Sequence, residues 1–183
     1  MTPAPGRVPL PLPDPPLTSG SLALRPWSPG DAPALVRAWA DADIARWTGV
    51  PRTPTLATAR RWIAGEEHRR ARGLSLDLVV DVDGALAGEV GLVAVSGRSD
   101  AVDLGWWTAA DRRGRGTAQT AAHLLAGWAV EELCIDLVLA RCAEDNPASG
   151  AVARAAGFAL VAAADGIQLW SYGPSAPAAT IGT

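Results

Sequence analysis

The 183-residue chain contains no lysine, two cysteines and two histidines. The two cysteines, Cys134 and Cys142, are isolated and form no CxxC pair, so the sequence indicates neither a disulfide framework nor a zinc site. Sixteen basic residues, all arginine, stand against 19 acidic ones, and this net charge of −3 disfavours nucleic acid as the main ligand. No apolar run approaches the roughly 18–20 residues that cross a bilayer, so we expect no membrane partner and a cytoplasmic protein.

What the chain does contain is enough apolar side chain for one compact core. Hydrophobic residues make up 49% of it and charged residues 19%. Residues 1–17 include seven prolines, which remove backbone donors and favour extended, solvated chain. We therefore expect a disordered tail over residues 1–17, a single domain over 18–173 and a flexible tail over 174–183.

Hydrophobic periodicity predicts a mixed α/β (α+β) domain. Asp83-Gly84 and Asp165-Gly166 each separate two short β-rich runs, which is typical of tight hairpin turns. Residues 96–100 form a further expected turn. The expected helices cover residues 33–42, 55–72, 118–133 and 147–156. The expected strands cover residues 21–27, 76–81, 85–93, 101–108, 137–143, 158–164 and 167–172.

A turn rich in glycine and arginine, residues 113–118, follows the strand at 101–108 and opens a helix. Free amides at a helix N-terminus point at an anion, the helix dipole adds positive charge, and glycine permits close approach of the backbone. The turn is no P-loop, because no Gly-Lys-Ser/Thr follows, and Gln119 stands where a dinucleotide motif needs its third glycine. By itself the turn is equally consistent with a surface loop carrying solvated arginines.

The surroundings of this turn make its interpretation more specific. Arg113-x-x-Gly116-x-Ala118 resembles the Q/R-x-x-G-x-G/A acyl-CoA pyrophosphate motif of the GNAT acetyltransferase superfamily. Asp103-Leu104-Gly105-Trp106-Trp107 before it, and Asn146-Pro147-Ala148-Ser149 with Gly157-Phe158 after it, are similar to the branch that acetylates ribosomal-protein N-termini. Leu24-Arg25-Pro26, followed by Asp31-Ala32, is similar to the opening of that branch. The resemblance covers residues 22–172.

This resemblance implies a GNAT-like fold, with a mostly antiparallel central sheet of about six or seven strands flanked by about four helices. It also implies that an acetyl group moves directly from acetyl-CoA to a primary amine, without a metal. The strand end would hold the pantetheine arm, and the amides of the turn would hold the pyrophosphate. The implied CoA-binding residues are Trp107, Thr108, Arg113, Gly114, Arg115, Gly116, Thr117, Ala118 and Asn146.

Three residues are candidates for proton transfer. Asp103 lies on the strand that leads to the turn, and Glu89 lies in an apolar strand where an unpaired charge is costly. Either carboxylate could instead form a salt bridge or lie at an exposed strand edge, and we expect Asp103 rather than Glu89 to act as the base. Ser149 matches the serine of the branch and is a candidate acid, or alternatively a helix-capping residue.

The acceptor is left open between a protein or peptide N-terminus and a small amine. Asp41, Asp43, Glu66 and Glu67 could form an acidic cluster that suits an aminoglycoside or a polyamine. Two departures from the superfamily pattern, Thr120 in place of a glutamate and Ala153 in place of a tyrosine acid, keep open a non-catalytic acyl-CoA sensor. A monomer and a homodimer are both consistent with the sequence.

Overall fold

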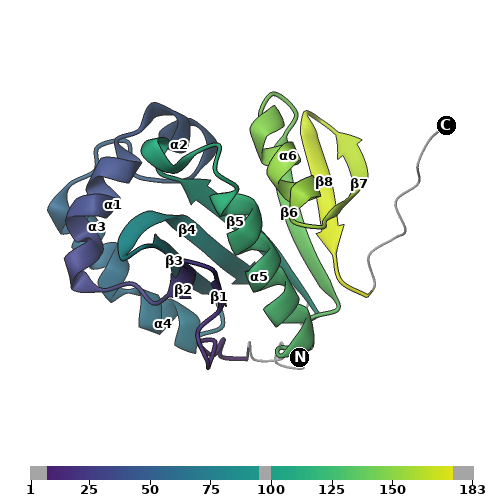
Figure 1. The fold of residues 1–183 in the computed structure, drawn as a ribbon, viewed down its shortest axis with the longest axis horizontal. Helices are drawn as coiled ribbons and strands as arrows, with labels where there is room; N and C mark the ends of the chain where they lie inside the picture. Colours follow the sequence, from purple (N-terminus) through teal and green to yellow (C-terminus); the bar gives the residue numbers. More distant parts are fainter. Residues whose placement is uncertain (1–7, 95–99, 175–183) are drawn as a thin grey trace, which may run out of the picture.

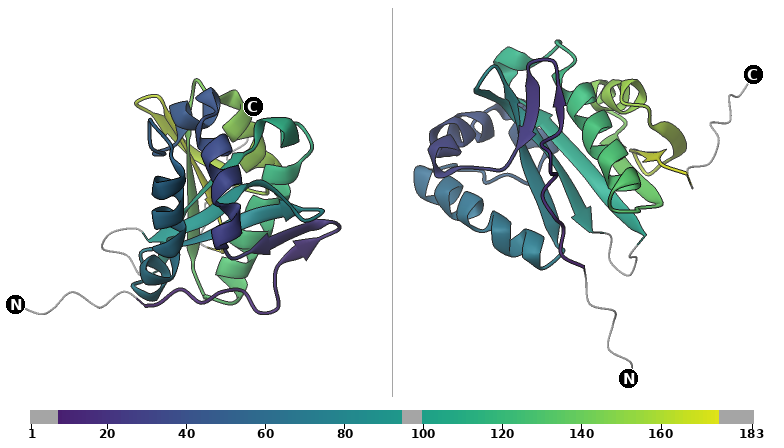
Figure 2. Two further views of the ribbon diagram at one scale, coloured as in Figure 1. Left: turned by 90° about the vertical axis from the view of Figure 1, so that its left-hand side faces the viewer. Right: turned by 60° about the horizontal axis from the view of Figure 1, so that its bottom comes forward.

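The computed structural model describes residues 8–94 and 100–174. In this part of the chain a central sheet carries helices on both faces, which gives three layers (Figures 1 and 2). The strands are β1 (Thr18–Ser19), β2 (Leu22–Arg25), β3 (Ser75–Val82), β4 (Ala85–Ala94), β5 (Ala101–Thr108), β6 (Leu137–Ala143), β7 (Ala159–Ala164) and β8 (Ile167–Tyr172). The α-helices are α1 (Ala32–Trp39), α2 (Ala42–Trp47), α3 (Leu56–Ala64), α4 (Glu66–Ala71), α5 (Thr117–Glu131) and α6 (Pro147–Ala155).

The strands follow the order β1-β2-β3-β4-β5-β6-β8-β7, and every neighbouring pair is antiparallel except β5 and β6. That parallel pair is short, because only Ala101–Asp103 pair with Leu137–Leu139. Strand β5 nevertheless stays paired with β4 as far as Thr108. Beyond Asp103 the two parallel strands therefore diverge, and the sheet splays open toward the top of Figure 1.

Side chains alternate between the two faces of the sheet and form two hydrophobic cores. Leu76, Leu78 and Val80 of β3 face the core that α5 and α6 cover. Val79, between them, faces the second core, where the tryptophans Trp27, Trp39 and Trp107 pack with α1 and α3. Helices α1 to α4 thus cover one face, and α5 and α6 cover the other (Figure 2).

The expected mixed architecture and its strands are confirmed. Both hairpin turns have the predicted left-handed backbone, with φ of 53° at Asp83, 78° at Gly84, 52° at Asp165 and 74° at Gly166. The described residues form eight strands and six α-helices, somewhat more than expected. One added strand is β1, whose two residues carry no periodic signal of their own.

One expected helix ends early and is followed by a helix that was not expected, and another is divided. The helix expected over residues 33–42 ends at Trp39, and α2 begins after it, because the Asp41 carboxylate accepts hydrogen bonds from the first amides of α2. The helix expected over residues 55–72 is interrupted at Gly65. A Cβ at Gly65 would lie 3.0 Å from Nη1 of Arg69, so glycine makes room for the Arg69 side chain.

The N-terminal segment contacts the domain from Leu10 onward. Leu10 is buried; its N–H donates to the Arg70 carbonyl at 3.0 Å, and its carbonyl accepts from Nη1 of Arg70 at 3.2 Å. Leu10 therefore packs against the domain and is not part of a fully solvated tail. Residues 1–7 and 175–183 of the expected tails, and residues 96–99 of the turn expected over 96–100, lie outside the described residues. No helix in the described ranges is long and apolar enough to cross a membrane.

Candidate active site

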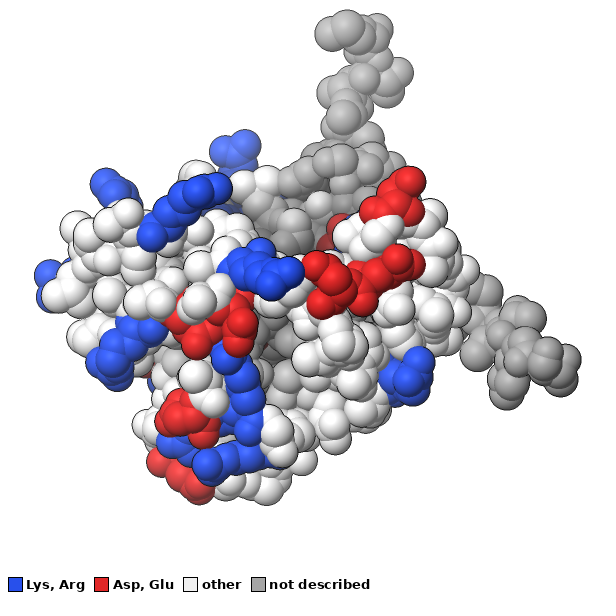
Figure 3. Space-filling model, turned by 90° about the horizontal axis from the view of Figure 1, so that it is seen from above, with Lys and Arg blue, Asp and Glu red and all other residues white. Residues whose placement is uncertain are grey.

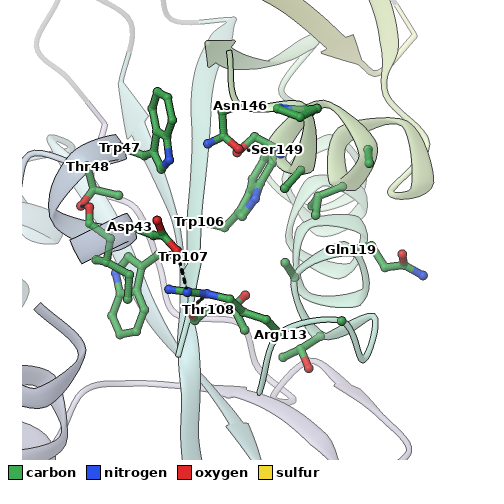
Figure 4. Close-up of a pocket in the computed structure, with 18 of the residues that line it drawn as sticks. Asp43, Trp47, Thr48, Trp106, Trp107, Thr108, Arg113, Gln119, Asn146 and Ser149 are labelled. Carbon is green, nitrogen blue, oxygen red and sulfur yellow. Dashed lines mark hydrogen bonds and ion pairs between the residues drawn. The ribbon is translucent and has the colours of Figure 1, made fainter. Parts of the chain in front are cut away.

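A cavity of about 700 Å³ lies at the open end of the splay between β5 and β6 (Figure 4). Four segments line it: α2 with Thr48, the end of β5, the loop into α5, and the turn that leads into α6. The expected site residues on its wall are Trp107, Thr108, Arg113, Gly114, Gly116, Thr117, Ala118, Asn146 and Ser149. Three other expected residues, Asp103, Glu89 and Arg115, do not line it.

The loop into α5 has the geometry of an anion-binding cradle. Gly114 and Gly116 have φ of 70° and 78°, which is the left-handed region that favours glycine. Gly116 is the N-cap of the 15-residue helix α5, and no side chain caps the first amides of that helix. Because these amides are uncapped beside the cavity and the helix dipole is positive there, the loop fits a pyrophosphate.

The arginines of the loop differ in their surroundings. Arg113 donates from Nη1 to Asp43 at 3.0 Å, from Nη2 to Asp41 at 2.5 Å, and from Nε to the Thr108 carbonyl at 3.3 Å. Its charge is therefore already paired with two carboxylates. Arg115 is exposed, lies outside the cavity wall and makes no ion pair with any described residue.

Aromatic and polar side chains from distant parts of the chain meet at the other end of the cavity. Trp47 and Thr48 come from the end of α2, and Trp106 comes from β5 (Figure 4). Arg46 on α2 reaches Asp145, before α6, with an Nη2 to Oδ2 distance of 3.2 Å. The sequence analysis assigned none of these residues to the site.

Ser149 lies on the cavity wall in the first turn of α6. Asn146 caps this helix, because its Oδ1 accepts from the Ser149 N–H at 3.3 Å. The Ser149 hydroxyl makes no hydrogen bond with the described residues, so it is not the cap. Asn146, and not Ser149, therefore caps α6, and the Ser149 hydroxyl is available to a ligand.

The two candidate carboxylates lie in different places. Asp103 belongs to the closed end of the splay, where it pairs in register with Leu139 and its Oδ1 lies 3.2 Å from Nε of Arg141. Four residues separate it from Trp107, which is about 13 Å along a strand. The geometry therefore places Asp103 away from the cavity, because the splay opens only beyond it.

Glu89 lies on β4 directly opposite Trp107, one strand behind the cavity wall. Its Oε2 is buried and has no hydrogen-bond partner among the described residues. Burial raises the pKa of Glu89 to about 8; the charge of Asp77 adds to the rise, and the charge of Arg69 and a hydrogen bond from the Trp107 side chain oppose it. Glu89 is thus a carboxyl group that titrates near neutral pH immediately behind a cavity residue.

The expected acidic cluster does not form. Glu66 is buried beside Arg70, 3.4 Å from its Nε, while Glu67 is an exposed residue of α4. Of the four acidic residues only Asp43 lines the cavity, and Arg113 pairs with it. Figure 3 looks onto this end of the molecule, and there acidic and basic side chains lie next to one another. The described acidic residues closest to the cavity, Asp43 and Asp145, are each paired with an arginine.

The sequence model of the acetyltransferase (GNAT) domain matches residues 21–159, which is most of the chain. This chain belongs to the GNAT family. The match includes β2 to β6, α5 and α6, and therefore all four segments that line the cavity. No curated protein matches the chain by sequence.

Solved structures with the same fold extend this finding. The RimL ribosomal L7/L12 α-N-protein acetyltransferase, solved with coenzyme A, superposes with a TM-score of 0.75 at 20% identity, over 86% of this chain and 97% of that one. The microcin C7 self-immunity acetyltransferase MccE, solved with acetyl-CoA and AMP, gives 0.73 at 17% identity, over 84% and 93%. RimJ of Mycobacterium smegmatis, solved with CoA disulfide, gives 0.72 at 21% identity, over 82% and 81%. At these identities the likeness is one of fold.

The sequence analysis of this GNAT protein missed helix α2 and the partners of Arg113, and only α2 had a local sequence pattern that could have indicated it. Asp41, two residues before Asp43 and directly after a helical segment, has the pattern of an N-cap and could have indicated α2. The pairing of Arg113 with Asp41 and Asp43 joins residues about 70 positions apart, and no local pattern encodes it.

Proposed function

We propose that this GNAT protein transfers an acetyl group from acetyl-CoA directly to a primary amine at the N-terminus of a protein or peptide. The observation that carries the proposal is the uncapped start of α5, with Gly114 and Gly116 in the left-handed region, at the mouth of the splay between β5 and β6. Family membership supports acetyl transfer as the reaction.

The pantetheine arm would bind along β5. From Leu104 to Thr108 this strand is paired with β4 on one edge and is no longer paired with β6 on the other. The backbone N–H and C=O groups on the β6 side therefore face the gap between the two strands. An amide-containing chain can pair with such an edge in the way an added strand does. Gly114, Gly116 and the first amides of α5 would then bind the pyrophosphate, with Asn146 on the opposite wall.

A thioester is an activated acyl donor, so the protein has to orient the amine and accept its proton. We assign the proton to Glu89, through a water molecule beside Trp107, because a pKa of about 8 suits a base that works near neutral pH. Ser149 would donate a hydrogen bond to the departing thiolate, since its hydroxyl is free and lies on the cavity wall.

Two observations favour a peptide N-terminus over a polyamine or aminoglycoside. The acidic residues that would attract a polycation are dispersed or paired with arginine. RimL, a ribosomal-protein N-terminal acetyltransferase, shares the fold over nearly its whole length.

The test is a turnover assay with acetyl-CoA, in which thiol release and product mass are measured. Acceptors would be short peptides with different first residues, including serine, together with spermidine and an aminoglycoside. We expect a peptide amine to be acetylated at its N-terminus. Preferred turnover of spermidine or the aminoglycoside would overturn the acceptor class, and binding of acetyl-CoA without turnover of any amine would indicate a sensor.

A further inference from the structure

Helix α2 lies beside the cavity, and ion pairs connect both of its ends to neighbouring loops. It has six residues, and Ile44 is its only buried one. Its start is joined to the loop before α5 by the two ion pairs of Arg113 with Asp41 and Asp43. Its end is joined to the turn before α6 by Arg46 and Asp145. A helix with so little buried surface depends on these contacts for its position.

The Arg113 contacts are the stronger of the two connections. Asp41 has 22% of its side chain exposed and Arg113 has 37%, whereas Arg46 and Asp145 have 63% and 66%. Exposed ion pairs contribute little, and partly buried ones with several hydrogen bonds contribute more. Burial acts to raise the pKa of Asp41, but hydrogen bonds from the Ile44 N–H and Arg113 outweigh it and leave the pKa below its usual value, so the carboxylate is charged.

Each of the three nitrogens of the Arg113 guanidinium donates a hydrogen bond: Nε to the Thr108 carbonyl at the end of β5, and Nη1 and Nη2 to the carboxylates at the start of α2. The guanidinium therefore connects the end of β5 with α2, the helix that brings Trp47 and Thr48 to the cavity (Figure 4). A phosphate that approached Arg113 would also meet two negative charges beside it.

We propose that Arg113, although it occupies the first position of the phosphate-binding motif, is a positioning residue that with Asp41 and Asp43 fixes α2 at the acceptor end of the cavity. The pyrophosphate is left to the backbone amides of the loop. The part of the inference that concerns the acceptor rests on the proposed function. Arg113 thus couples the loop that binds the donor to the helix that helps to bind the acceptor.

The first experiment compares Arg113→Ala and Asp43→Asn with wild type by hydrogen exchange of residues 42–48 and by calorimetric titration with CoA. We expect Arg113→Ala, which removes both ion pairs, to speed exchange of the α2 amides about three- to tenfold, and Asp43→Asn, which removes the more exposed pair, to speed it by less. We expect both variants to change the Kd for CoA less than about threefold. The double variant should be no worse than Arg113→Ala alone, because Arg113→Ala already removes the contact with Asp43.

The direction in which Asp43→Asn changes the Kd for CoA distinguishes a phosphate-binding role of Arg113 from a positioning role. If Arg113 is a phosphate ligand restrained by its carboxylates, Asp43→Asn tightens CoA binding while Arg113→Ala weakens it more than tenfold, and that outcome overturns the proposal. Unchanged exchange of α2 in both variants also overturns it. Asp43 has 70% of its side chain exposed, so Asp43→Asn keeps the test valid even if Arg113→Ala folds poorly.

Three further variants sharpen the result. Arg115→Ala removes an exposed arginine of the same loop that makes no ion pair in the described structure, and α2 exchange should stay at the wild-type rate. Asp41→Asn keeps a good helix cap while removing the charge, so faster exchange in it reports the ion pair and not the cap. Arg113→Lys, with one ammonium for two carboxylates, should restore the slow exchange in part.

Kinetics with an N-terminal-serine peptide as the probe give the functional result. Arg113→Ala should raise the KM for the peptide at least threefold and leave the KM for acetyl-CoA near its wild-type value. A rise confined to the KM for acetyl-CoA would contradict the proposal. Exchange of α2 needs neither substrate, so failure of the proposed function, seen as wild-type protein that does not acetylate peptides, is distinguishable from failure of this inference.

Discussion

The two sides of the cavity are built in different ways. The donor side rests on α5, a 15-residue helix with six buried residues, and its loop conformation is fixed by glycines at positive φ. The acceptor side rests on α2, a six-residue helix with one buried residue, which ion pairs hold in place. In the proposed function, the side that binds acyl-CoA is thus fixed by packing and backbone, and the side that meets the acceptor is held by surface charge.

The largest effect should come from the donor side. Gly116→Val places a β-branched side chain at φ of 78° and obstructs the approach of the backbone to a phosphate. Backbone strain of about 1–3 kcal/mol and a lost charge-assisted hydrogen bond of about 1.5–3 kcal/mol together predict CoA binding weakened about 10²- to 10⁴-fold. Calorimetric titration measures this loss, and circular dichroism checks the fold.

Gly84→Val is the matched control for that variant. Gly84 has the same φ of 78°, lies in the β3–β4 turn outside the cavity wall, and a Cβ there meets nothing within 4 Å. It should bind CoA like wild type. Normal binding by Gly116→Val would mean that the cradle is only a surface turn.

The next largest effect should come from Glu89→Gln, with kcat lowered about 10²-fold. Because the base form of Glu89 is needed, kcat/KM of the wild-type enzyme should rise with pH to a plateau above about pH 8, and the variant should lose this dependence. Asp103→Asn is the control, since it lies at the closed end of the splay and should keep the wild-type profile. A selective loss of rate in Asp103→Asn instead would return the role to that carboxylate.

The same pKa has a consequence for stability. The folded pKa of Glu89, about 8, lies above the usual value of 4.5, so the folded state binds a proton that the unfolded state releases. The free energy of unfolding should therefore be highest below about pH 4.5, so far as Glu89 is concerned, and fall as pH rises to about 8. Glu89→Gln should reduce that fall in urea denaturation at pH 5 and pH 8.5.

Ser149→Ala should have a smaller effect, because a hydroxyl that stabilises a departing thiolate by one hydrogen bond to a charged atom is worth about 1.5–3 kcal/mol at most. We expect kcat to fall about tenfold or somewhat more, with the melting temperature unchanged, since Asn146 and not Ser149 caps α6. An unchanged kcat would remove Ser149 from the mechanism.

The smallest effect should come from the second connection of α2. Arg46→Ala breaks an ion pair whose two side chains are mostly exposed, which is worth about 0–1 kcal/mol. The rate with a peptide acceptor should change less than about threefold, and less than in Arg113→Ala. A larger loss in Arg46→Ala would mean that Arg46 contacts the acceptor itself.

The same contrast explains what could be predicted from the sequence. The loop at residues 113–118 and both Asp-Gly hairpins were predictable, because glycine and aspartate specify their backbone locally. The position of Asp103 outside the cavity wall was not, because it depends on the residue at which β5 and β6 part, which is a matter of register between strands. The partners of Arg113 were not predictable either, because the fold brings them together from far along the chain.

The three-residue pairing of β5 with β6 bears on how cooperatively this sheet unfolds. It leaves β1 to β5 and β6 to β8 as two halves with few hydrogen bonds between them, and α5, which packs against β4, β5 and β6, is the element that joins them. A molecule bound in the splay would add contacts to both halves at once. Acetyl-CoA at 100 times its Kd would then stabilise the folded chain by about 2.7 kcal/mol. Because the bound molecule would contact both parts of the sheet, they should unfold in a single cooperative transition.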